Sequence, residues 1–375
     1  MELYSDFKRK DDISRLVSII VSEVKKPVNI MEICGGHTHS IMKYGLNTLL
    51  KDKINFLHGP GCPVCVMPLK RIDEAVEIAD SPGVILAAYG DMMRVPGTDS
   101  SLIKERAKGK DVRMIYSPLD IIKIAEDKTN KDKKIVFFAI GFETTTPMTA
   151  ALLEEVIARR INNVLFHVNH VLVPPPINAI LDSGDNLIDG FICPGHVSVM
   201  TGSGIYADIP LKYKKAAVIA GFEPYDILSG TLLIARQINE GRPAVEIAYK
   251  RAVKEVGNKK AQDLVNKYFT VRDEFEWRGF GNIPKSGLKL RDEFKNFDAE
   301  YIFKDKLEEL RLKAGAGRAG KENAVCKCGE ILKGKSKPDD CPLFGKACNP
   351  ENPVGACMVS FEGACAAYYK YRILN

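Results

Sequence analysis

The chain contains 375 residues, of which 45% are hydrophobic, and 54 Lys and Arg against 48 Asp and Glu give a formal net charge of +6. This length allows two or three domains with a large core. The basic residues form no block and only one Trp is present, so the composition does not support nucleic-acid binding.

Export and membrane signals are not indicated either. Residues 1–12 carry charges where a signal peptide would place its apolar stretch. No uncharged apolar run approaches the roughly 20 residues that a membrane helix needs. We therefore expect a soluble, cytoplasmic protein with no membrane partner, in which the ten cysteines are metal ligands or redox groups rather than a disulfide framework.

The first predicted elements lead to a cysteine and two histidines. A helix with apolar residues at helical spacing begins at Asp11 and ends before Pro27. A buried strand is predicted over residues 28–33, and it runs directly into Cys34 to His39, the run Cys-Gly-Gly-His-Thr-His. A second helix is predicted to begin near Ile41. Polar chemistry therefore follows the carboxyl end of the first strand.

The second predicted strand, residues 54–57, leads into a pair of cysteines. The run from His58 to Cys65 is His-Gly-Pro-Gly-Cys-Pro-Val-Cys, and Pro68 follows it. The Gly and Pro residues make a rigid turn that holds the sulfurs of Cys62 and Cys65 on one side. Such a pair indicates either a redox dithiol or half of a metal site. A helix over residues 69–79 comes next.

The middle of the chain repeats this order of strand and helix. Strands are predicted at residues 84–88, 112–116, 135–140, 164–168, 187–193 and 216–220. Their alternation with helical segments predicts an α/β fold with parallel sheets. In open parallel sheets the ligand site lies beyond the carboxyl ends of the strands, where the Cys, His and Glu motifs fall.

Two short fragments occur twice, each time after an apolar strand. Ile-Cys-Gly-Gly-His at residues 33–37 resembles Ile-Cys-Pro-Gly-His at 192–196, and Gly-Phe-Glu at 141–143 recurs at 221–223. The echo is either a coincidence or the mark of two related α/β halves that face one another across a cleft. We interpret it as two domains, residues 1–127 and 128–312.

Glu143 precedes three threonines and Pro147. This pattern suits a helix start in which a threonine satisfies free N–H groups, and it also suits an active role, because a helix N-terminus favours an anion such as cyanide or phosphate. His196 either faces the same cleft from the second half or is a structural histidine bonded to a backbone carbonyl. Cys193 is expected to be a small buried side chain.

The last third of the chain changes in character. Residues 243–269 are predicted to be helical, and residues 315–320 match G-x-G-x-x-G but follow a predicted helix, so they are interpreted as a linker. Six of the ten cysteines then lie between Cys326 and Cys365, with Pro-rich and Gly-rich connections. Residues 313–375 are therefore predicted to be a third domain that needs metal to fold. Zinc or an iron-sulfur cluster would take four of the six thiols.

Four blocks and the cysteine-rich tail together resemble the HypD family, whose members help to assemble the iron centre of nickel-iron hydrogenases. The blocks are Cys34-Gly-Gly-His37-Thr-His39, Gly59-Pro-Gly-Cys62-Pro-Val-Cys65, Gly141-Phe-Glu143-Thr144-Thr145 and Pro194-Gly-His196-Val-Ser198. The resemblance spans nearly the whole chain in the expected order. It implies a scaffold on which an iron that carries cyanide and carbon monoxide is built before delivery to the hydrogenase.

The resemblance also implies roles for the cysteines. Cys34 would hold the iron together with a small chaperone of the HypC type, cyanide would arrive from a HypE-type partner, and Cys62 and Cys65 would form a dithiol in the cleft. The tail would hold a 4Fe-4S cluster similar to that of ferredoxin-thioredoxin reductase. Its expected ligands are Cys326, Cys341, Cys348 and Cys365, and the expected redox pair is Cys328 and Cys357.

The residue types agree with that chemistry. Low-spin Fe(II) with diatomic ligands suits a soft thiolate, and we expect the helix dipole to deprotonate Cys34. His37 and His39 would be hydrogen-bond donors or proton carriers near the iron. If they lie on a strand-like turn, only one of them faces the metal. We further expect the sulfurs of Cys34, Cys62 and Cys65 to meet in one solvent-reachable pocket.

Two other functions remain open from the sequence. One is an iron-sulfur-dependent protein disulfide reductase, in which electrons pass from the tail to Cys62 and Cys65. The other is a zinc-stabilised interaction module. The sequence leaves open whether the chain is an enzyme, and it favours an assembly scaffold with thiol redox activity over a stand-alone turnover enzyme.

Overall fold

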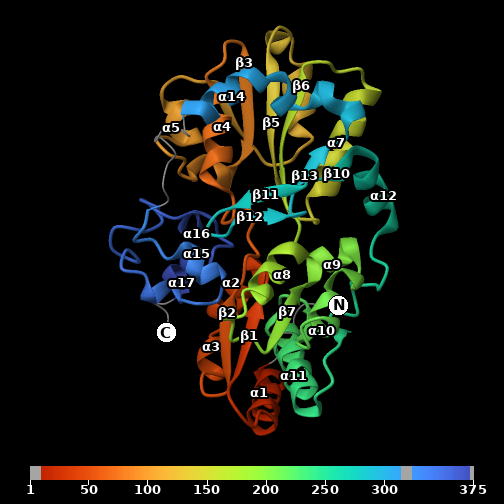
Figure 1. Ribbon diagram of the computed structural model, residues 1–375, viewed down its shortest axis with the longest axis vertical. Helices are drawn as coiled ribbons and strands as arrows, with labels where there is room; N and C mark the ends of the chain where they lie inside the picture. The colour runs from red at the N-terminus through yellow and green to blue at the C-terminus, as the bar shows by residue number, and fades with distance from the viewer. Residues whose placement is uncertain (1–9, 314–322, 372–375) are drawn as a thin grey trace.

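Two parallel sheets, joined through one shared core, organise the computed structural model, which describes residues 10–313 and 323–371. A five-stranded sheet has the order β2-β1-β7-β8-β9, and a four-stranded sheet has the order β4-β3-β5-β6. Figure 1 shows the four-stranded sheet at the top and the five-stranded sheet at the bottom. The strands are β1 (Val28–Glu32), β2 (Ile54–His58), β3 (Val84–Tyr89), β4 (Val112–Ile115), β5 (Lys134–Gly141), β6 (Val164–His170), β7 (Gly190–Pro194), β8 (Ala216–Ala220) and β9 (Val245–Ile247). The predicted α/β class is confirmed.

The division of the chain at residue 127 does not match the strand pairing. β1 pairs in parallel with β7, so that Ile30 lies opposite Gly190 and Glu32 opposite Ile192. The chain therefore starts in the five-stranded sheet, forms the whole four-stranded sheet, and returns. The repeated fragments around Cys34 and Cys193 end adjacent strands of one sheet. They do not face each other from two separate halves.

Both faces of each sheet are buried, which explains the uninterrupted apolar strands in the sequence. In β5 the side chains of Ile135 and Phe137 join one cluster, whereas Val136 and Phe138 point to the opposite face and join another. The second of these clusters also contains one face of the five-stranded sheet and the tail cysteines. A single core therefore connects the two sheets and the tail.

Helices cover the outer faces of both sheets (Figure 1). Around the five-stranded sheet lie α1 (Lys10–Glu23), α2 (Gly35–Lys43), α3 (Leu46–Leu49), α8 (Pro174–Asp182), α9 (Gly195–Thr201), α10 (Asp208–Leu211) and α11 (Pro224–Glu240). With the four-stranded sheet lie α4 (Leu69–Ala79), α5 (Leu102–Ala107), α6 (Asp120–Glu126), α7 (Thr146–Ala158), α13 (Ala299–Ile302) and α14 (Lys304–Lys313). Short 3-10 helices occur at Gly90–Arg94, Lys128–Asn130, Gly204–Tyr206, Asp292–Phe297 and Pro338–Asp340.

The predicted helix over residues 243–269 is wrong in its first half. That part forms β9, which pairs with β8, and only α12 (Lys259–Tyr268) is helical. The helix begins there because the Asn258 side chain accepts a hydrogen bond from the backbone N–H of Ala261, a typical N-cap. Gly257 precedes it with φ +66, a conformation that glycine adopts readily.

Two small antiparallel pairs follow, β10 (Phe269–Val271) with β13 (Leu288–Leu290) and β11 (Glu274–Trp277) with β12 (Gly281–Pro284). The cysteine-rich tail contains α15 (Cys328–Leu332), α16 (Ala356–Val359) and α17 (Ala364–Tyr371). Figure 1 shows it in blue at the side of the molecule, near the level where the two sheets meet.

Among the described residues, no helix combines the length and apolar character needed to cross a bilayer. The predicted linker at 315–320 lies outside the described residues.

Candidate functional site

Cys34 lies at the carboxyl end of β1 and forms the N-cap of α2. The helix begins at Gly35, earlier than the predicted start near Ile41. β1 and β2 are adjacent parallel strands, so the loops that follow them lie at the same edge of the sheet. The backbone N–H of Gly35 donates to the carbonyl of Gly61 at 3.4 Å. A Cβ on Gly61 would lie 2.2 Å from the Cys34 nitrogen, so only glycine allows the two cysteine loops to approach this closely.

His196 is the histidine that faces Cys34. Its two ring nitrogens lie 3.8 and 3.9 Å from the Cys34 sulfur, because β7, which precedes His196, pairs with β1. The His196 ring stacks on Phe222 with centroids 4.9 Å apart. Burial lowers the pKa of His196 to about 4, so the ring is neutral near pH 7. Of the two alternatives for His196, the structure favours a position beside Cys34, although the ring reaches it from an adjacent strand of the same sheet and not across a cleft.

His37 and His39 have different surroundings. His37 is buried, and its ring stacks on Phe222 with centroids 4.7 Å apart. Its Nε2 lies 3.0 Å from the carbonyl oxygen of Gly221. Burial is the main cause that lowers the pKa of His37 to about 3, and repulsion from a protonated His196 lowers this pKa further. His39 instead contacts the tail, where its Nε2 lies 2.9 Å from the Tyr371 hydroxyl. Both histidines lie on α2 rather than on a strand-like turn.

The Cys34 thiol is not activated in the described structure. Burial raises its pKa well above the usual value, and negative charge on Glu362 and Glu32 adds to the increase. The N–H groups of Gly36 and His37 at the start of α2 oppose this effect without overcoming it. The expected deprotonation of Cys34 by the helix dipole is therefore not supported by its surroundings, because removal from water raises the thiol pKa by more than the helix N–H groups lower it.

Glu143 lies after β5, at the end of a strand of the other sheet. Its Oε1 accepts a hydrogen bond from the Val173 N–H at 3.0 Å, whereas its buried Oε2 has no hydrogen-bond partner among the residues that the structure describes. Burial raises its pKa to about 7. Glu143 also lines a groove with Pro147 of α7 and Met200 of α9. The threonine cap that the sequence suggested is not formed, because the Thr145 hydroxyl donates to the Phe142 carbonyl and makes no capping hydrogen bond to α7.

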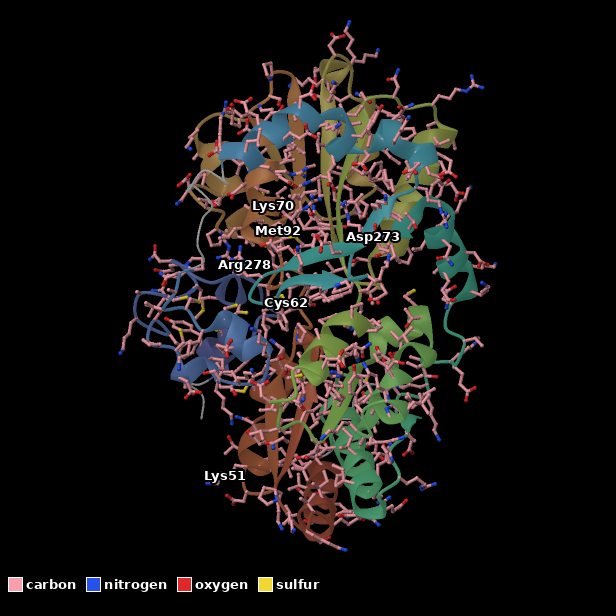
Figure 2. All side chains as sticks on the ribbon, in the orientation of Figure 1. Lys51, Cys62, Lys70, Met92, Asp273 and Arg278 are labelled. Carbon is pink, nitrogen blue, oxygen red and sulfur yellow. A yellow bond between two sulfur atoms is a disulfide. The ribbon has the colours of Figure 1, made fainter. Side chains whose placement is uncertain are left out.

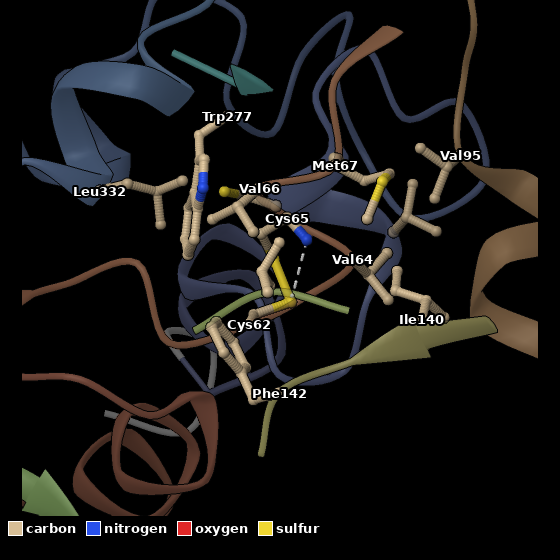
Figure 3. Packing of buried hydrophobic residues seen from close by; sticks show 14 of the residues in the cluster. Cys62, Val64, Cys65, Val66, Met67, Val95, Ile140, Phe142, Trp277 and Leu332 are labelled. Atoms are coloured by element: carbon tan, nitrogen blue, oxygen red, sulfur yellow. Dashed lines mark hydrogen bonds between the residues drawn. A yellow bond between two sulfur atoms is a disulfide. The ribbon is translucent and has the colours of Figure 1, made fainter. Parts of the chain in front are cut away.

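Cys62 and Cys65 form a disulfide rather than a pair of free thiols. Figure 2 places Cys62 between the two sheets, and Figure 3 shows the disulfide among Phe142, Trp277 and Leu332. The exposed fractions of Cys34, Cys62 and Cys65 are 1%, 2% and 0%. The two cysteine loops are in contact, as expected, but the expected solvent-reachable pocket is wrong. Apolar side chains from both sheets and the tail close the site.

The six tail cysteines line one small cavity, together with Phe344 and Met358. Among residues 10–313 and 323–371, no three Cys, His, Asp or Glu side chains lie close enough to hold a single metal ion. Thiolates around an iron-sulfur cube bind different iron atoms, so they are spaced more widely than ligands of one zinc ion. The sulfurs of Cys328 and Cys357 lie 2.6 Å apart. The described tail therefore brings six thiols together and places two of them, Cys328 and Cys357, next to each other.

Several residues of the site were not singled out from the sequence. Phe222 contacts both His37 and His196; its place in the repeated Gly-Phe-Glu fragment was the available signal. The carbonyl of Glu362 in the tail lies 2.1 Å from where a Cβ on Gly35 would be, and no sequence signal connects these segments. Tyr206 is buried at the centre of the site. Negative charge on Cys193, Glu143 and Cys34 adds to the effect of burial in raising its pKa.

These side chains give the site a defined chemical character. It contains a buried thiol, a neutral imidazole beside that thiol, and a disulfide in the adjacent loop. The apolar surroundings exclude water, which strengthens electrostatic interactions at the sulfur. Such a site can hold a soft metal ion and can protect water-sensitive chemistry.

Comparisons with known proteins agree with this character. Residues 11–372 match the family described as HypD, the hydrogenase formation hypA family. The chain is 48% identical to the hydrogenase maturation factor HypD of Azotobacter vinelandii, over 99% of this chain and 97% of that protein. It is 47% identical to HypD2 of Bradyrhizobium diazoefficiens, with the same coverage. The HypD protein of Escherichia coli K12 is 42% identical over 99% of this chain and 98% of its own length.

Proposed function

This chain belongs to the HypD family of hydrogenase maturation factors, and from that premise we propose that it is the scaffold on which the iron centre of a nickel-iron hydrogenase receives cyanide and carbon monoxide. The iron is the cargo of the reaction. Cys34 holds it together with a small chaperone of the HypC type, and a HypE-type partner donates the cyanide. The observation that carries the proposal is the position of the Cys34 sulfur, which faces His196 and lies in the loop packed against Cys62 and Cys65.

The chain supplies three effects at the cargo iron. The Cys34 thiol loses its proton as the iron binds, because the metal stabilises the thiolate that burial disfavours. His196 is neutral and lies beside the sulfur, so its N–H can donate to the thiolate or to a cyanide nitrogen. The buried surroundings keep water away from the growing complex. Glu143 and Cys34 both act electrostatically on the Tyr206 hydroxyl. Because the pKa of Glu143 is about 7, its carboxyl group can accept or return a proton near neutral pH.

We propose that the tail would hold a 4Fe-4S cluster through Cys326, Cys341, Cys348 and Cys365, with Cys328 and Cys357 as the neighbouring redox pair. The six cysteines around one cavity and the short distance between the Cys328 and Cys357 sulfurs support this assignment. Such a cluster supplies electrons one at a time to the two-electron couple of a disulfide. Gly355 supports this arrangement, because a Cβ there would lie 2.9 Å from the Cys326 sulfur. The chain's own contribution is to keep six sulfurs together in one largely apolar cavity.

Infrared spectroscopy of the anaerobically purified complex with the small chaperone tests the proposal. The wild-type complex should contain iron beyond the cluster and show bands from bound cyanide and carbon monoxide. Cys34→Ala should abolish the bands and leave the visible absorption of the cluster intact. Cys193→Ala is the matched control, because Cys193 is also buried and ends the neighbouring strand of the same sheet. Bands that persist in Cys34→Ala contradict the assignment.

A protein disulfide reductase is the second candidate, and two observations favour it. The Cys62–Cys65 disulfide and the close pair of Cys328 and Cys357 are both redox-active in type. A separate cavity reaches Cys326 and Cys328. Turnover of a disulfide substrate with a reduced electron donor, in the absence of partner proteins and extra iron, would support this candidate. A colourless protein that contains zinc would instead support the interaction module.

A further inference from the structure

A buried chain of hydrogen bonds connects the tail to the backbone of Cys34. The hydroxyl of Tyr368 in α17 lies 3.0 Å from Nε2 of His58. Nδ1 of the same imidazole lies 2.7 Å from Oε1 of Glu32. The other carboxylate oxygen of Glu32 accepts a hydrogen bond from the Cys34 N–H at 3.0 Å. Thr38 also donates its hydroxyl to Glu32. Four polar groups therefore form one continuous path from the tail to the cysteine loop.

Water cannot replace these bonds. The exposed fractions of Glu32, His58 and Tyr368 are 0%, 2% and 7%. A buried polar group that loses its partner carries the full penalty of its removal from water, so a network of this kind holds its members rigidly. The ring of Tyr368 also packs edge-on against the His58 ring, with centroids 5.2 Å apart. The geometry is therefore fixed by both packing and hydrogen bonding.

Each end of the path is attached to a functional cysteine. Tyr368 follows Cys365 by three residues in α17, so the two side chains lie on the same side of that helix. At the other end, Glu32 fixes the direction of the Cys34 N–H, where the strand β1 gives way to the helix α2. A shift of that amide rotates the backbone at Cys34 and moves its sulfur relative to His196.

We infer that Tyr368, His58 and Glu32 are positioning residues. Through their hydrogen bonds, the position of α17, the helix that carries Cys365, determines the orientation of Cys34. This inference rests on the proposed function for the roles of the two cysteines. None of the three side chains touches the cargo iron. They act through the backbone of Cys34. The orientation of the Cys34 sulfur, the proposed iron ligand, therefore depends on the correct packing of the cysteine-rich tail.

The test compares Tyr368→Phe with Tyr369→Phe in the full chain with its cluster. Tyr368→Phe keeps the ring and removes the hydroxyl that bonds to His58. Tyr369→Phe makes the same chemical change at the next position, where the ring packs against Phe344. The first measurement is hydrogen exchange at the Cys34 amide. Tyr368→Phe should accelerate it roughly fivefold, the factor expected when one net hydrogen bond is lost, and Tyr369→Phe should leave it unchanged.

The second measurement is the infrared spectrum of the complex with the small chaperone. In Tyr368→Phe the cyanide and carbonyl bands should shift in frequency while the cluster absorption is retained. His58→Gln, a second break in the same path, should change both measurements in the same direction. Exchange and bands identical to wild type would overturn the inference. If the wild-type complex shows no cyanide or carbonyl bands, and Tyr368→Phe still accelerates exchange at the Cys34 amide, the linkage is supported and the proposed function is contradicted.

Discussion

At the residue scale, Glu143 is the acidic group whose environment most clearly changes its chemistry. One carboxylate oxygen accepts from the Val173 N–H, whereas the other is buried without a partner. Burial raises its pKa from 4.5 to about 7. The folded protein therefore binds this proton more tightly than the unfolded chain does. The stabilising contribution of the protonated form is complete below about pH 4.5 and is lost as the pH rises through about 7.

We predict that Glu143→Gln removes this pH dependence, because the amide resembles the protonated carboxyl in shape and stays neutral. A pKa difference of that size corresponds to roughly 3 kcal/mol as an upper limit. The variant should therefore be more stable than wild type at about pH 8, by up to that amount, and nearly equal to it at about pH 5. Denaturant titrations of both proteins at the two pH values measure the difference. A gain of equal size at both pH values contradicts the assignment of the pKa.

The residue types of the site could be predicted from the sequence, but their partners could not. The motifs around Cys34 and Cys62 predicted cysteine chemistry at strand ends, and the six tail cysteines predicted a zinc site or an iron-sulfur cluster. That His196 faces Cys34, whereas His39 faces the tail, depends on strand pairing between segments more than 150 residues apart. The raised pKa of Cys34 likewise depends on Glu362, which reaches it through tertiary folding. Local patterns do not contain such distances.

At the element scale, the β11–β12 hairpin covers the Cys62–Cys65 disulfide. Its turn residue Arg278 donates its N–H to the Val66 carbonyl and its Nε–H to the Met67 carbonyl, each at 2.8 Å. A Cβ on Gly279 would lie 2.4 Å from Cα of Gly329. The hairpin therefore contacts both the loop that carries the disulfide and the helix that begins at Cys328. It holds the only Trp of the chain beside the disulfide (Figure 3).

We predict that the fluorescence of Trp277 reports the redox state of this disulfide. An indole in contact with a disulfide is quenched by electron transfer to the sulfurs, and reduction removes the acceptor. Treatment with a strong reductant should therefore increase the emission of the wild-type protein. Cys62→Ala, which cannot form the disulfide, should show high emission before and after treatment. Equal emission from wild type and Cys62→Ala under oxidising conditions would exclude contact between the indole and the disulfide.

Hydrophobic patterns predicted most of the longer helices and strands. The strands could be recognised as uninterrupted apolar runs because both faces of each sheet are buried. The predicted helix at residues 69–79 coincides with α4, and the strand at 216–220 coincides with β8. The hairpin β11–β12 was not predicted, because its residues alternate over only four positions on each strand. The early start of α2 was missed because two glycines open it; glycine disfavours helices in isolation. The backbone of Glu362 requires glycine at position 35, and the ring of Phe222 leaves little room for a Cβ at position 36.

At the scale of the whole molecule, the order of strands decides which parts depend on each other. The five-stranded sheet needs β7, β8 and β9 beside β1 and β2, and the four-stranded sheet needs β5 and β6 beside β3 and β4. Sequence patterns predicted the strands but not their neighbours, since the connection between two paired parallel strands needs only a minimum length of about a dozen residues and can be much longer. The sequence interpretation therefore placed the division at residue 127, where a charged connector lies.

We predict that residues 1–127 and 128–375, expressed separately, do not fold. The first fragment would leave β1 without β7 and β3 without β5, and the second would leave the opposite edges unpaired. Unpaired apolar edges of this kind promote aggregation. Each fragment alone should therefore be insoluble or lack cooperative unfolding, whereas co-expression should yield a complex with the circular dichroism of the intact chain. Two fragments that unfold cooperatively on their own would show that the sheets are independent, contrary to the strand order.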